Sequence, residues 1–310
     1  MDRPYVHRVR VQNFRCIKSA DLHLTPLHAL VGPNDSGKSS LLTAILGGQA
    51  LYWLNQHNVV LGNDNRPHPG GYPNIASTHI LSDSEAAVEA LYRASRVRRQ
   101  LRLDPDALRK RKALIPSGTV LWFDDDVGNG LPALYDALLS RDRDAFIALD
   151  KRFCTLFPTV RALRLRNIDA TTKALGLTLH NGQEVSASEM SEGMLYWLAY
   201  AIVEHLAQPG ILLIEEPENG LHPARIAEVV HVLREISERT QIIIATHSPL
   251  VLNELKPDEV TIVTRPAGET ICTPMTQTKN FAERFKTYAL GELWLSYADG
   301  NIEGNLVSGS

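Results

Sequence analysis

Apolar and polar residues follow two periods along this chain, one typical of strands and one typical of helices. Alternating residues predict a strand over 5–12, and short strands are expected at 19–24 and 27–31. In the second half, apolar runs alternate with segments of helical period. The strands expected there are 211–215, 241–246, 259–264 and 270–275, and the helices are 191–207 and 223–238. One or two further helices are expected over 131–154. This order predicts an α/β fold with a mostly parallel sheet flanked by helices.

The middle of the chain has a weaker pattern. From about residue 47 to 84 no period is sustained, and the glycine- and proline-rich stretch 61–74 predicts a loop. The 84–113 segment predicts a helix, but it does not sustain the heptads of a coiled coil. The other elements expected here are a strand over 118–124 and a hairpin over 177–185, turning at Asn181 and Gly182.

This middle part predicts a compact helical lid or arm. We therefore expect one domain formed by residues 1–50 and 155–310, into which residues 51–154 are inserted. Nine basic and two acidic residues lie between Arg93 and Lys112. These charges predict one of two things. They form a surface that binds DNA or a partner protein, with Arg96, Arg98 and Arg99 as its cluster, or they are a solvated helix face.

Composition narrows the class of protein. The 310 residues are 44% hydrophobic and 22% charged, with a net charge of −3, which is ordinary for a soluble globular protein. No apolar run reaches the length of a membrane span, and no signal peptide is evident at the N-terminus. Three widely spaced cysteines suggest neither a disulfide framework nor a zinc site. We therefore expect a cytoplasmic protein.

A glycine-rich turn lies between the third expected strand and a helix. Gly32, Gly37, Lys38 and Ser39 have the spacing G-x-x-x-x-G-K-S, the Walker A pattern. Backbone N–H groups of such a turn and the start of the helix bind phosphate oxygens, the lysine reaches the β- and γ-phosphates, and the serine hydroxyl binds Mg²⁺. The turn predicts an ATP site with Mg²⁺. Its candidate ligands are Gly32, Asn34, Asp35, Ser36, Gly37, Lys38, Ser39 and Ser40.

Two further strand ends carry chemistry suited to this site. Glu215 and Glu216 end the apolar run 211–214; the first can reach the Mg²⁺ shell, and the second can act as a general base toward water. His247 ends another apolar strand and can sense the γ-phosphate. The alternatives are two solvated glutamates and a histidine bonded to backbone.

A serine and a glycine, Ser191 and Gly193, open the helix expected at 191–207. They either cap that helix or offer free amides to an anion.

Four motifs in order, GPNDSGKSS, MSEGML, LLIEEPENGLHP and ATHSP, carry a family resemblance. The chain resembles an ABC-type ATPase of the SMC/RecF/OLD branch, which implies a P-loop NTPase fold of ABC type. The resemblance covers about residues 1–50 and 175–265.

The resemblance implies further roles. Ser191 and Gly193 match the signature loop, which contacts ATP on the opposite subunit, and 218–222 match the D-loop at the dimer interface. His247 matches the switch histidine, and Arg15 matches an arginine near the nucleotide. The family's Q-loop glutamine has only Gln49 and Gln56 as candidates, by location.

The resemblance also suggests a biological role. OLD-like chains often carry a C-terminal nuclease domain, but only about 45 residues follow residue 265 here, so we expect none. We expect an ATPase that dimerises head to tail around ATP, with no membrane contact, and gates a partner effector such as a nuclease in bacterial anti-phage defence. The alternatives are a RecF-like DNA-repair ATPase, a transporter subunit and a nucleotide sensor without hydrolysis.

Overall fold

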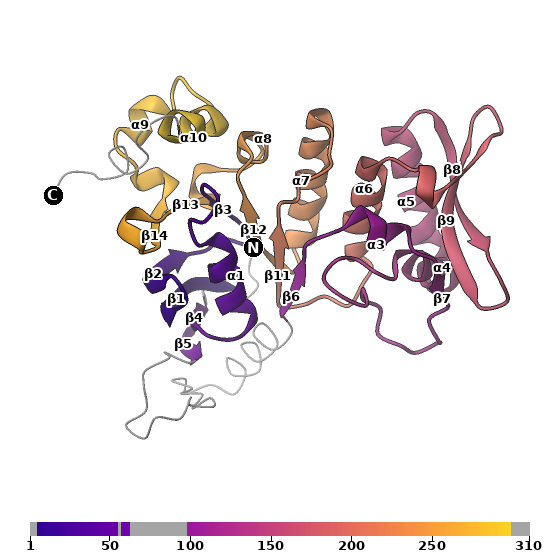
Figure 1. Cartoon of the computed structure of the whole chain (residues 1–310), viewed down its shortest axis with the longest axis horizontal. Helices are drawn as coiled ribbons and strands as arrows, with labels where there is room; N and C mark the ends of the chain where they lie inside the picture. The colour runs from indigo at the N-terminus through magenta and orange to yellow at the C-terminus, as the bar shows by residue number, and fades with distance from the viewer. Residues whose placement is uncertain (1–4, 55–56, 63–97, 299–310) are drawn as a thin grey trace. The chain divides into compact units, whose positions relative to one another are not determined.

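The computed structural model describes residues 5–54, 57–62 and 98–298 (Figure 1). Contacts within the chain group it into two compact units. Unit 1 comprises Met1–Gln100, Pro209–Glu218 and Ser237–Ser310, and unit 2 comprises Leu101–Gln208 and Asn219–Ile236. The expected insertion over 51–154 overlaps unit 2 only in part, and it remains a prediction.

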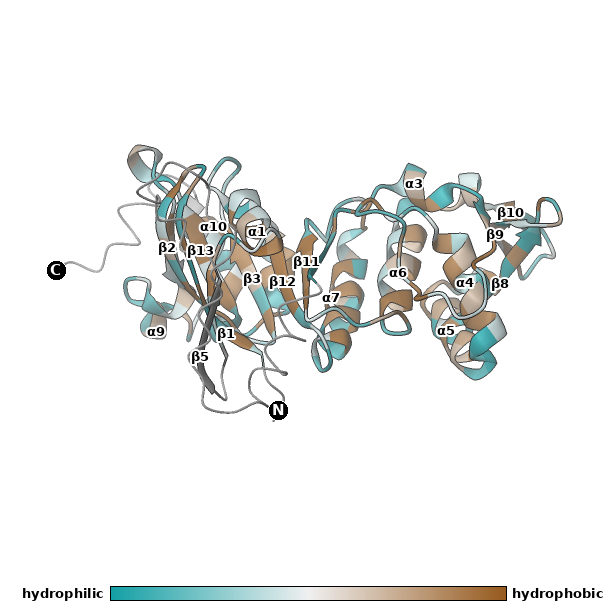
Figure 2. Cartoon of the chain, turned by 90° about the horizontal axis from the view of Figure 1, so that it is seen from below, coloured by the Kyte–Doolittle hydropathy of each residue, from teal (hydrophilic) through white to brown (hydrophobic). Residues whose placement is uncertain are grey.

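The main sheet of unit 1 has six strands in the order β14-β13-β3-β12-β11-β6. Neighbouring strands among β13, β3, β12 and β11 are parallel, and β14 is antiparallel to β13. The three strands β3, β12 and β13 are buried at every residue, as expected for the centre of a parallel sheet. Figure 2 shows the hydropathy of the residues along these strands. The bounds are β3 Leu27–Val31, β6 Arg98–Leu101, β11 Ile211–Glu215, β12 Gln241–Thr246, β13 Val260–Thr264 and β14 Ile271–Pro274.

A second sheet in unit 1 is antiparallel, in the order β2-β1-β4-β5. Its strands are β1 Val6–Phe14, β2 Ile17–His23, β4 Leu51–Leu54 and β5 His57–Gly62. Buried residues of this sheet, of the main sheet and of helix α1 (Lys38–Leu46) form one hydrophobic cluster. This shared core fixes α1 against both sheets and therefore fixes the loop that precedes it.

Among its described residues, unit 1 also contains the short helices α8 Pro249–Asn253, α9 Phe281–Arg284 and α10 Leu290–Ala298. Helix α10 packs closely on α8, because a Cβ atom added at Gly291 would lie 2.3 Å from the carbonyl oxygen of Pro249. The buried indole of Trp294 on α10 donates to the carbonyl oxygen of His247 (3.3 Å). Helix α10, near the C-terminal end of the described chain, therefore fixes the backbone at His247, directly after β12.

Unit 2 combines helices with a small antiparallel sheet in which β9 pairs with β7, β8 and β10. Helices α4 and α5 pack on this sheet, and α6 is buried along most of its length (Figure 2). The bounds are α3 Pro105–Arg109, β7 Lys112–Ala113, α4 Leu131–Arg141, α5 Arg143–Leu156, β8 Val160–Asn167, β9 Thr172–Leu179, β10 Glu184–Ser186, α6 Glu192–Val203 and α7 Pro223–Ser237.

Most expected elements are confirmed, including both helices within 131–154 and the 177–185 hairpin. The strand expected over 118–124 is wrong. Its alternation is real, since Leu121 and Phe123 are buried and Val120 is exposed, but the segment belongs to no sheet. Strands β4, β5 and β8 were not expected; the four residues of β4 are apolar throughout and show no alternation.

The helix expected over 84–113 is also wrong where the structure describes it. Residues 98–113 form β6, α3 and β7 instead, and residues 84–97 lie outside the described part. Asp104 accepts hydrogen bonds from the first turn of α3, and Pro105 occupies its first position, so a new short helix starts there. Most of the loop expected over 61–74 lies outside the described residues as well.

Among the described residues, no helix is long and apolar enough to cross a membrane.

Candidate active site

The glycine-rich turn connects β3 to α1, as the sequence predicts. Gly37 has φ +105°, and a Cβ atom there would lie 2.3 Å from Oγ1 of Thr270. A Cβ atom at Gly32 would lie 2.2 Å from the carbonyl oxygen of Val263. Gly37 therefore requires glycine because of its backbone conformation, and neither Gly37 nor Gly32 has room for a Cβ atom.

Lys38 lies in the curve of this turn. Its ammonium group donates to the carbonyl oxygens of Gly32 (2.7 Å) and Pro33 (2.9 Å), and the residue is buried. Burial lowers the pKa of Lys38, while the nearby carboxylates of Glu216, Glu218, Glu215 and Asp35 favour its charged form. A phosphate placed in the turn would give this desolvated cation an anionic partner.

Beside the turn, Glu215 at the end of β11 meets two polar side chains. Ser39 Oγ donates to one carboxylate oxygen (3.4 Å), and Gln100 Nε2 donates to the other (2.7 Å). A hydroxyl, a carboxylate and an amide are the oxygen ligands that suit Mg²⁺, if the amide turns its oxygen to the metal. The donor set therefore fits this ion.

Gln100 is a residue that sequence reasoning missed. It comes from β6, which borders β11 at the edge of the main sheet. Gln49, one candidate from location, follows α1, and its N–H donates to Ala44. Gln56, the other, lies outside the described residues. The glutamine that contacts Glu215 is therefore Gln100.

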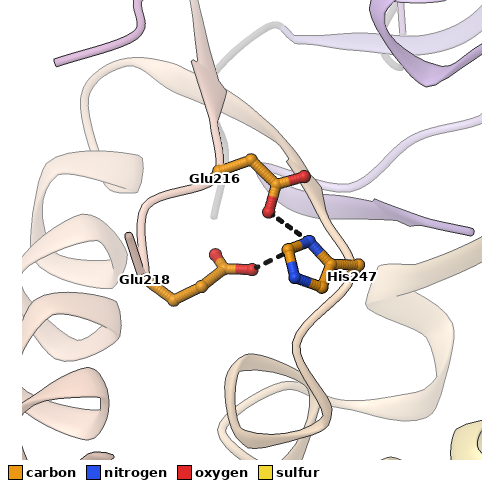
Figure 3. A group of neighbouring side chains, drawn as sticks. All are labelled: Glu216, Glu218 and His247. Carbon is orange, nitrogen blue, oxygen red and sulfur yellow. Dashed lines mark ion pairs between the residues drawn. The ribbon is translucent and has the colours of Figure 1, made fainter. Parts of the chain in front are cut away.

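Glu216, Glu218 and His247 form a close group at the ends of β11 and β12 (Figure 3). Nδ1 of His247 lies 2.6 Å from Oε2 of Glu216 and 4.0 Å from Oε1 of Glu218. The Thr246 hydroxyl donates to Glu218. Glu216 has φ +48° and donates its N–H to the carbonyl oxygen of Ala245 (2.8 Å), so the chain turns sharply and aims this carboxylate at His247.

The surroundings of Glu216 raise the pKa of its carboxyl group. Burial, followed by the charge of Glu218 and a hydrogen bond with it, raises the pKa of Glu216 to about 7, against the opposing effects of His247 and Lys38. The side chain of Glu218 is only 8% exposed. A carboxylate whose pKa lies near neutrality is suited to take a proton from water at physiological pH.

The remaining candidates in unit 1 lie around α1. The Arg15 guanidinium donates to the Thr43 hydroxyl (3.4 Å) and lies over the ring of Phe14. The Ser40 hydroxyl is 3.5 Å from Sγ of Cys16. In the turn itself, Asn34 is exposed, Asp35 has φ +63°, and Ser36 is buried.

Ser191 and Gly193 belong to unit 2. Ser191 is the N-cap of α6, and its hydroxyl accepts from the N–H of Met194 (3.4 Å), so the capping role is confirmed. A Cβ atom at Gly193 would lie 3.8 Å from Leu221 and 3.9 Å from Gly220. The start of α6 thus adjoins residues of the 218–222 segment within the same unit.

The basic residues of 93–112 are divided among several elements. Arg98 donates to the carbonyl oxygen of Leu46 (3.5 Å), Arg109 pairs with Asp106, and Lys112 pairs with Asp124. Arg93 and Arg96 lie outside the described residues. A role of this segment in DNA or partner binding stays a prediction.

The strand–turn–helix at Lys38 and the acidic strand end at Glu216 together define a P-loop ATPase. The family described as "AAA domain, putative AbiEii toxin, Type IV TA system" matches residues 27–253, and the chain belongs to this family. A second family, described as "AAA ATPase domain", matches residues 5–47.

One similar protein is an OLD nuclease. An OLD nuclease of Thermus scotoductus (strain ATCC 700910 / SA-01) is 24% identical over 312 residues, which cover 78% of this chain and 59% of that protein. The chain therefore spans somewhat over half the length of this relative.

Solved structures share the fold. The SMC head domain from Thermotoga maritima aligns with a TM-score of 0.53 and 14% identity, over 87% of this chain and 98% of that one. An SMC head bound to the C-winged helix domain of ScpA aligns with a TM-score of 0.57 and 16% identity, over 87% and 97%. The chain is an ABC-type ATPase of the SMC/RecF/OLD branch.

Proposed function

We propose that the turn at Lys38 holds the triphosphate of ATP and that Glu216 activates the water that attacks it. The observation that carries this proposal is the position of the Lys38 ammonium inside the turn, where the charges of Glu215, Glu216 and Glu218 favour its protonated form. In this proposal residues 32–40 supply amides and hydroxyls to the phosphates. Arg15, which donates to Thr43 on α1, is proposed to lie near the nucleotide.

Ser39, Glu215 and Gln100 are the residues that would hold Mg²⁺. When bound, this ion neutralises charge on the β- and γ-phosphates. In the proposal, Glu216 accepts the proton of the attacking water. His247 holds the Glu216 carboxylate through its 2.6 Å contact. In this proposal it also senses the γ-phosphate.

The pH dependence of hydrolysis should report Glu216. Because its pKa is raised to about 7, the carboxylate is protonated below that pH and cannot accept a proton. We expect kcat/KM for ATP to fall as the pH drops through about 7, with a slope of one. Glu218→Gln removes the neighbouring charge and should move the midpoint to lower pH. A midpoint near 4.5, the ordinary value for glutamate, would contradict this role of Glu216.

We further propose that two copies of the chain enclose two ATP molecules, head to tail. The start of α6 supports this, because Ser191 and Gly193 stand at a helix N-terminus, where backbone amides favour an anion. The signature pattern at these residues and the SMC-head fold also support it. Ser191 of one copy would then contact the γ-phosphate bound at Lys38 of the other.

Ser191→Arg should prevent ATP-induced dimerisation, because the arginine side chain would fill the space between the two copies. The lost cap costs about 1 kcal/mol, so the variant stays folded. We expect dimerisation with ATP to weaken at least about tenfold, measured by sedimentation in the Glu216→Gln background. Ser188→Arg, an exposed serine three residues earlier, is the control and should dimerise normally. Normal dimerisation of Ser191→Arg would refute the signature-loop assignment.

The output of the ATPase is proposed to be a partner effector, such as a nuclease, in bacterial anti-phage defence. The similarity to an OLD nuclease supports this proposal. Three free cysteines fit a cytoplasmic location.

Tagged Glu216→Gln, purified from the native host with ATP and Mg²⁺, should retain this effector, and Lys38→Ala should not. Recovery of salt-releasable DNA alone would favour the RecF-like repair ATPase instead.

A further inference from the structure

We propose that Thr270 is a positioning residue for ATP binding: it fixes the Ser36–Gly37 peptide of the phosphate-binding turn. This inference rests on the proposed role of that turn. Thr270 is the last residue of the loop that joins β13 to β14, directly before β14. It is 2% exposed and therefore would not touch the nucleotide itself.

The first observation is a hydrogen bond from Thr270 to the turn. Its Oγ1 donates to the carbonyl oxygen of Ser36 at 3.1 Å. A trans peptide is planar, so the carbonyl and the N–H of one peptide point in opposite directions. A bond that holds the Ser36 carbonyl toward Thr270 therefore turns the N–H of Gly37 away from Thr270. This N–H is one of the amides expected to bind phosphate.

The second observation is the packing of Thr270 on Gly37. A Cβ atom at Gly37 would lie 2.3 Å from Oγ1 and 3.1 Å from Cγ2 of Thr270. Thr270 therefore occupies the space that a side chain at position 37 would need. Gly37 is held at φ +105°, immediately before the first residue of α1.

Thr270 is itself fixed by its surroundings. Its N–H donates to the carbonyl oxygen of Cys16 (3.3 Å), and its hydroxyl lies 3.5 Å from Sγ of that residue. The hairpin tip is a tight turn in which Ala267 (φ +50°) and Gly268 (φ +85°) both have left-handed backbone.

The same hairpin touches the turn at two other points. Nη1 of Arg265 is 3.5 Å from the carbonyl oxygen of Asp35, and the carbonyl of Val263 faces Gly32. The hairpin thus packs against the phosphate-binding turn, and its shortest hydrogen bond to the turn is the 3.1 Å bond from Thr270.

Thr270→Val tests the proposal, because it removes the hydroxyl at nearly constant volume. We expect the KM for ATP to rise about tenfold, the loss expected for one buried hydrogen bond, while kcat changes less than about twofold. Thr270→Ser keeps the hydroxyl and should restore the KM. Thr270→Ala removes the same hydroxyl without the added methyl group and should raise the KM similarly, so the test stands if the valine variant is unstable.

The matched control is Thr278→Val. Thr278 is also a buried threonine of unit 1, and its hydroxyl donates to the carbonyl oxygen of Met275 at 2.8 Å. It should lose similar thermal stability but keep the wild-type KM. An unchanged KM in Thr270→Val, or an equal rise in Thr278→Val, overturns the proposal.

Lys38→Ala is measured alongside, because it distinguishes a failure of the proposed role of Thr270 from a failure of the proposed ATP-binding role of the turn. If Lys38→Ala abolishes ATP binding and Thr270→Val behaves as wild type, only the role of Thr270 is refuted. If Lys38→Ala also leaves binding unchanged, both the turn's role and the role of Thr270 are refuted.

Discussion

Replacing Lys38 with alanine is expected to weaken ATP binding at least about 100-fold, because two or more charge-assisted hydrogen bonds to phosphate are lost. The ammonium is preorganised for this task. It is buried in the turn and held by the carbonyl oxygens of Gly32 and Pro33. The Lys38 side chain therefore loses little conformational entropy when phosphate binds. Titration of the variant with ATP, followed by calorimetry, measures the loss.

The control for Lys38→Ala is Lys18→Ala. Lys18 is an exposed lysine of the same unit, and its ammonium lies 3.2 Å from Glu269 at the surface. Its replacement should leave ATP affinity unchanged, since a surface ion pair contributes little. Equal affinities of Lys38→Ala and wild type would show that ATP does not bind at this turn.

Glu216→Gln is expected to slow hydrolysis by a factor of about 100 to 10,000, the range typical of general-base catalysis, while ATP still binds. The amide has nearly the same shape as the carboxylate but cannot accept a proton from water. It also removes a negative charge near the phosphates, so ATP affinity should be equal or higher. Phosphate release under saturating ATP, together with a binding titration, separates the two effects.

An isosteric change elsewhere in unit 1 is the control. Glu283→Gln on α9 exchanges the same groups in a residue outside the acidic group and should leave both hydrolysis and binding unchanged. Wild-type turnover by Glu216→Gln would exclude this carboxylate as the base, and the pH dependence would then need another explanation.

The sequence predicted the parts of the site that are local in the chain. The run before Gly32 and the helix after Gly37 have clear periods, and the spacing of Lys38 within the turn is specific enough to identify its chemistry. The same holds for Glu216 and His247, because each follows a buried strand and the ends of parallel strands meet at one edge of a sheet.

Contacts between distant residues could not be predicted in this way. Gln100 meets Glu215 only because β6 borders β11, and 115 residues separate them. Thr270 meets Ser36 across 234 residues. Neither position carries a local pattern, so no sequence signal pointed to them.

The helix expected over 84–113 is wrong over its described residues, 98–113, for a different reason. Its basic residues suggested one continuous charged face, but Asp104 and Pro105 mark the start of a separate short helix. That signal is local and was available in the sequence. One of the basic residues, Lys112, pairs with Asp124 from another segment.

A structure of Glu216→Gln with ATP and Mg²⁺ tests the central claim most directly. We expect two copies head to tail, the β- and γ-phosphates at Lys38, the metal between Ser39 and Glu215, and Ser191 of the opposite copy at the γ-phosphate. Nucleotide bound away from Gly32–Ser39, or bound there in a single copy with Ser191 remote from any phosphate, would contradict the account.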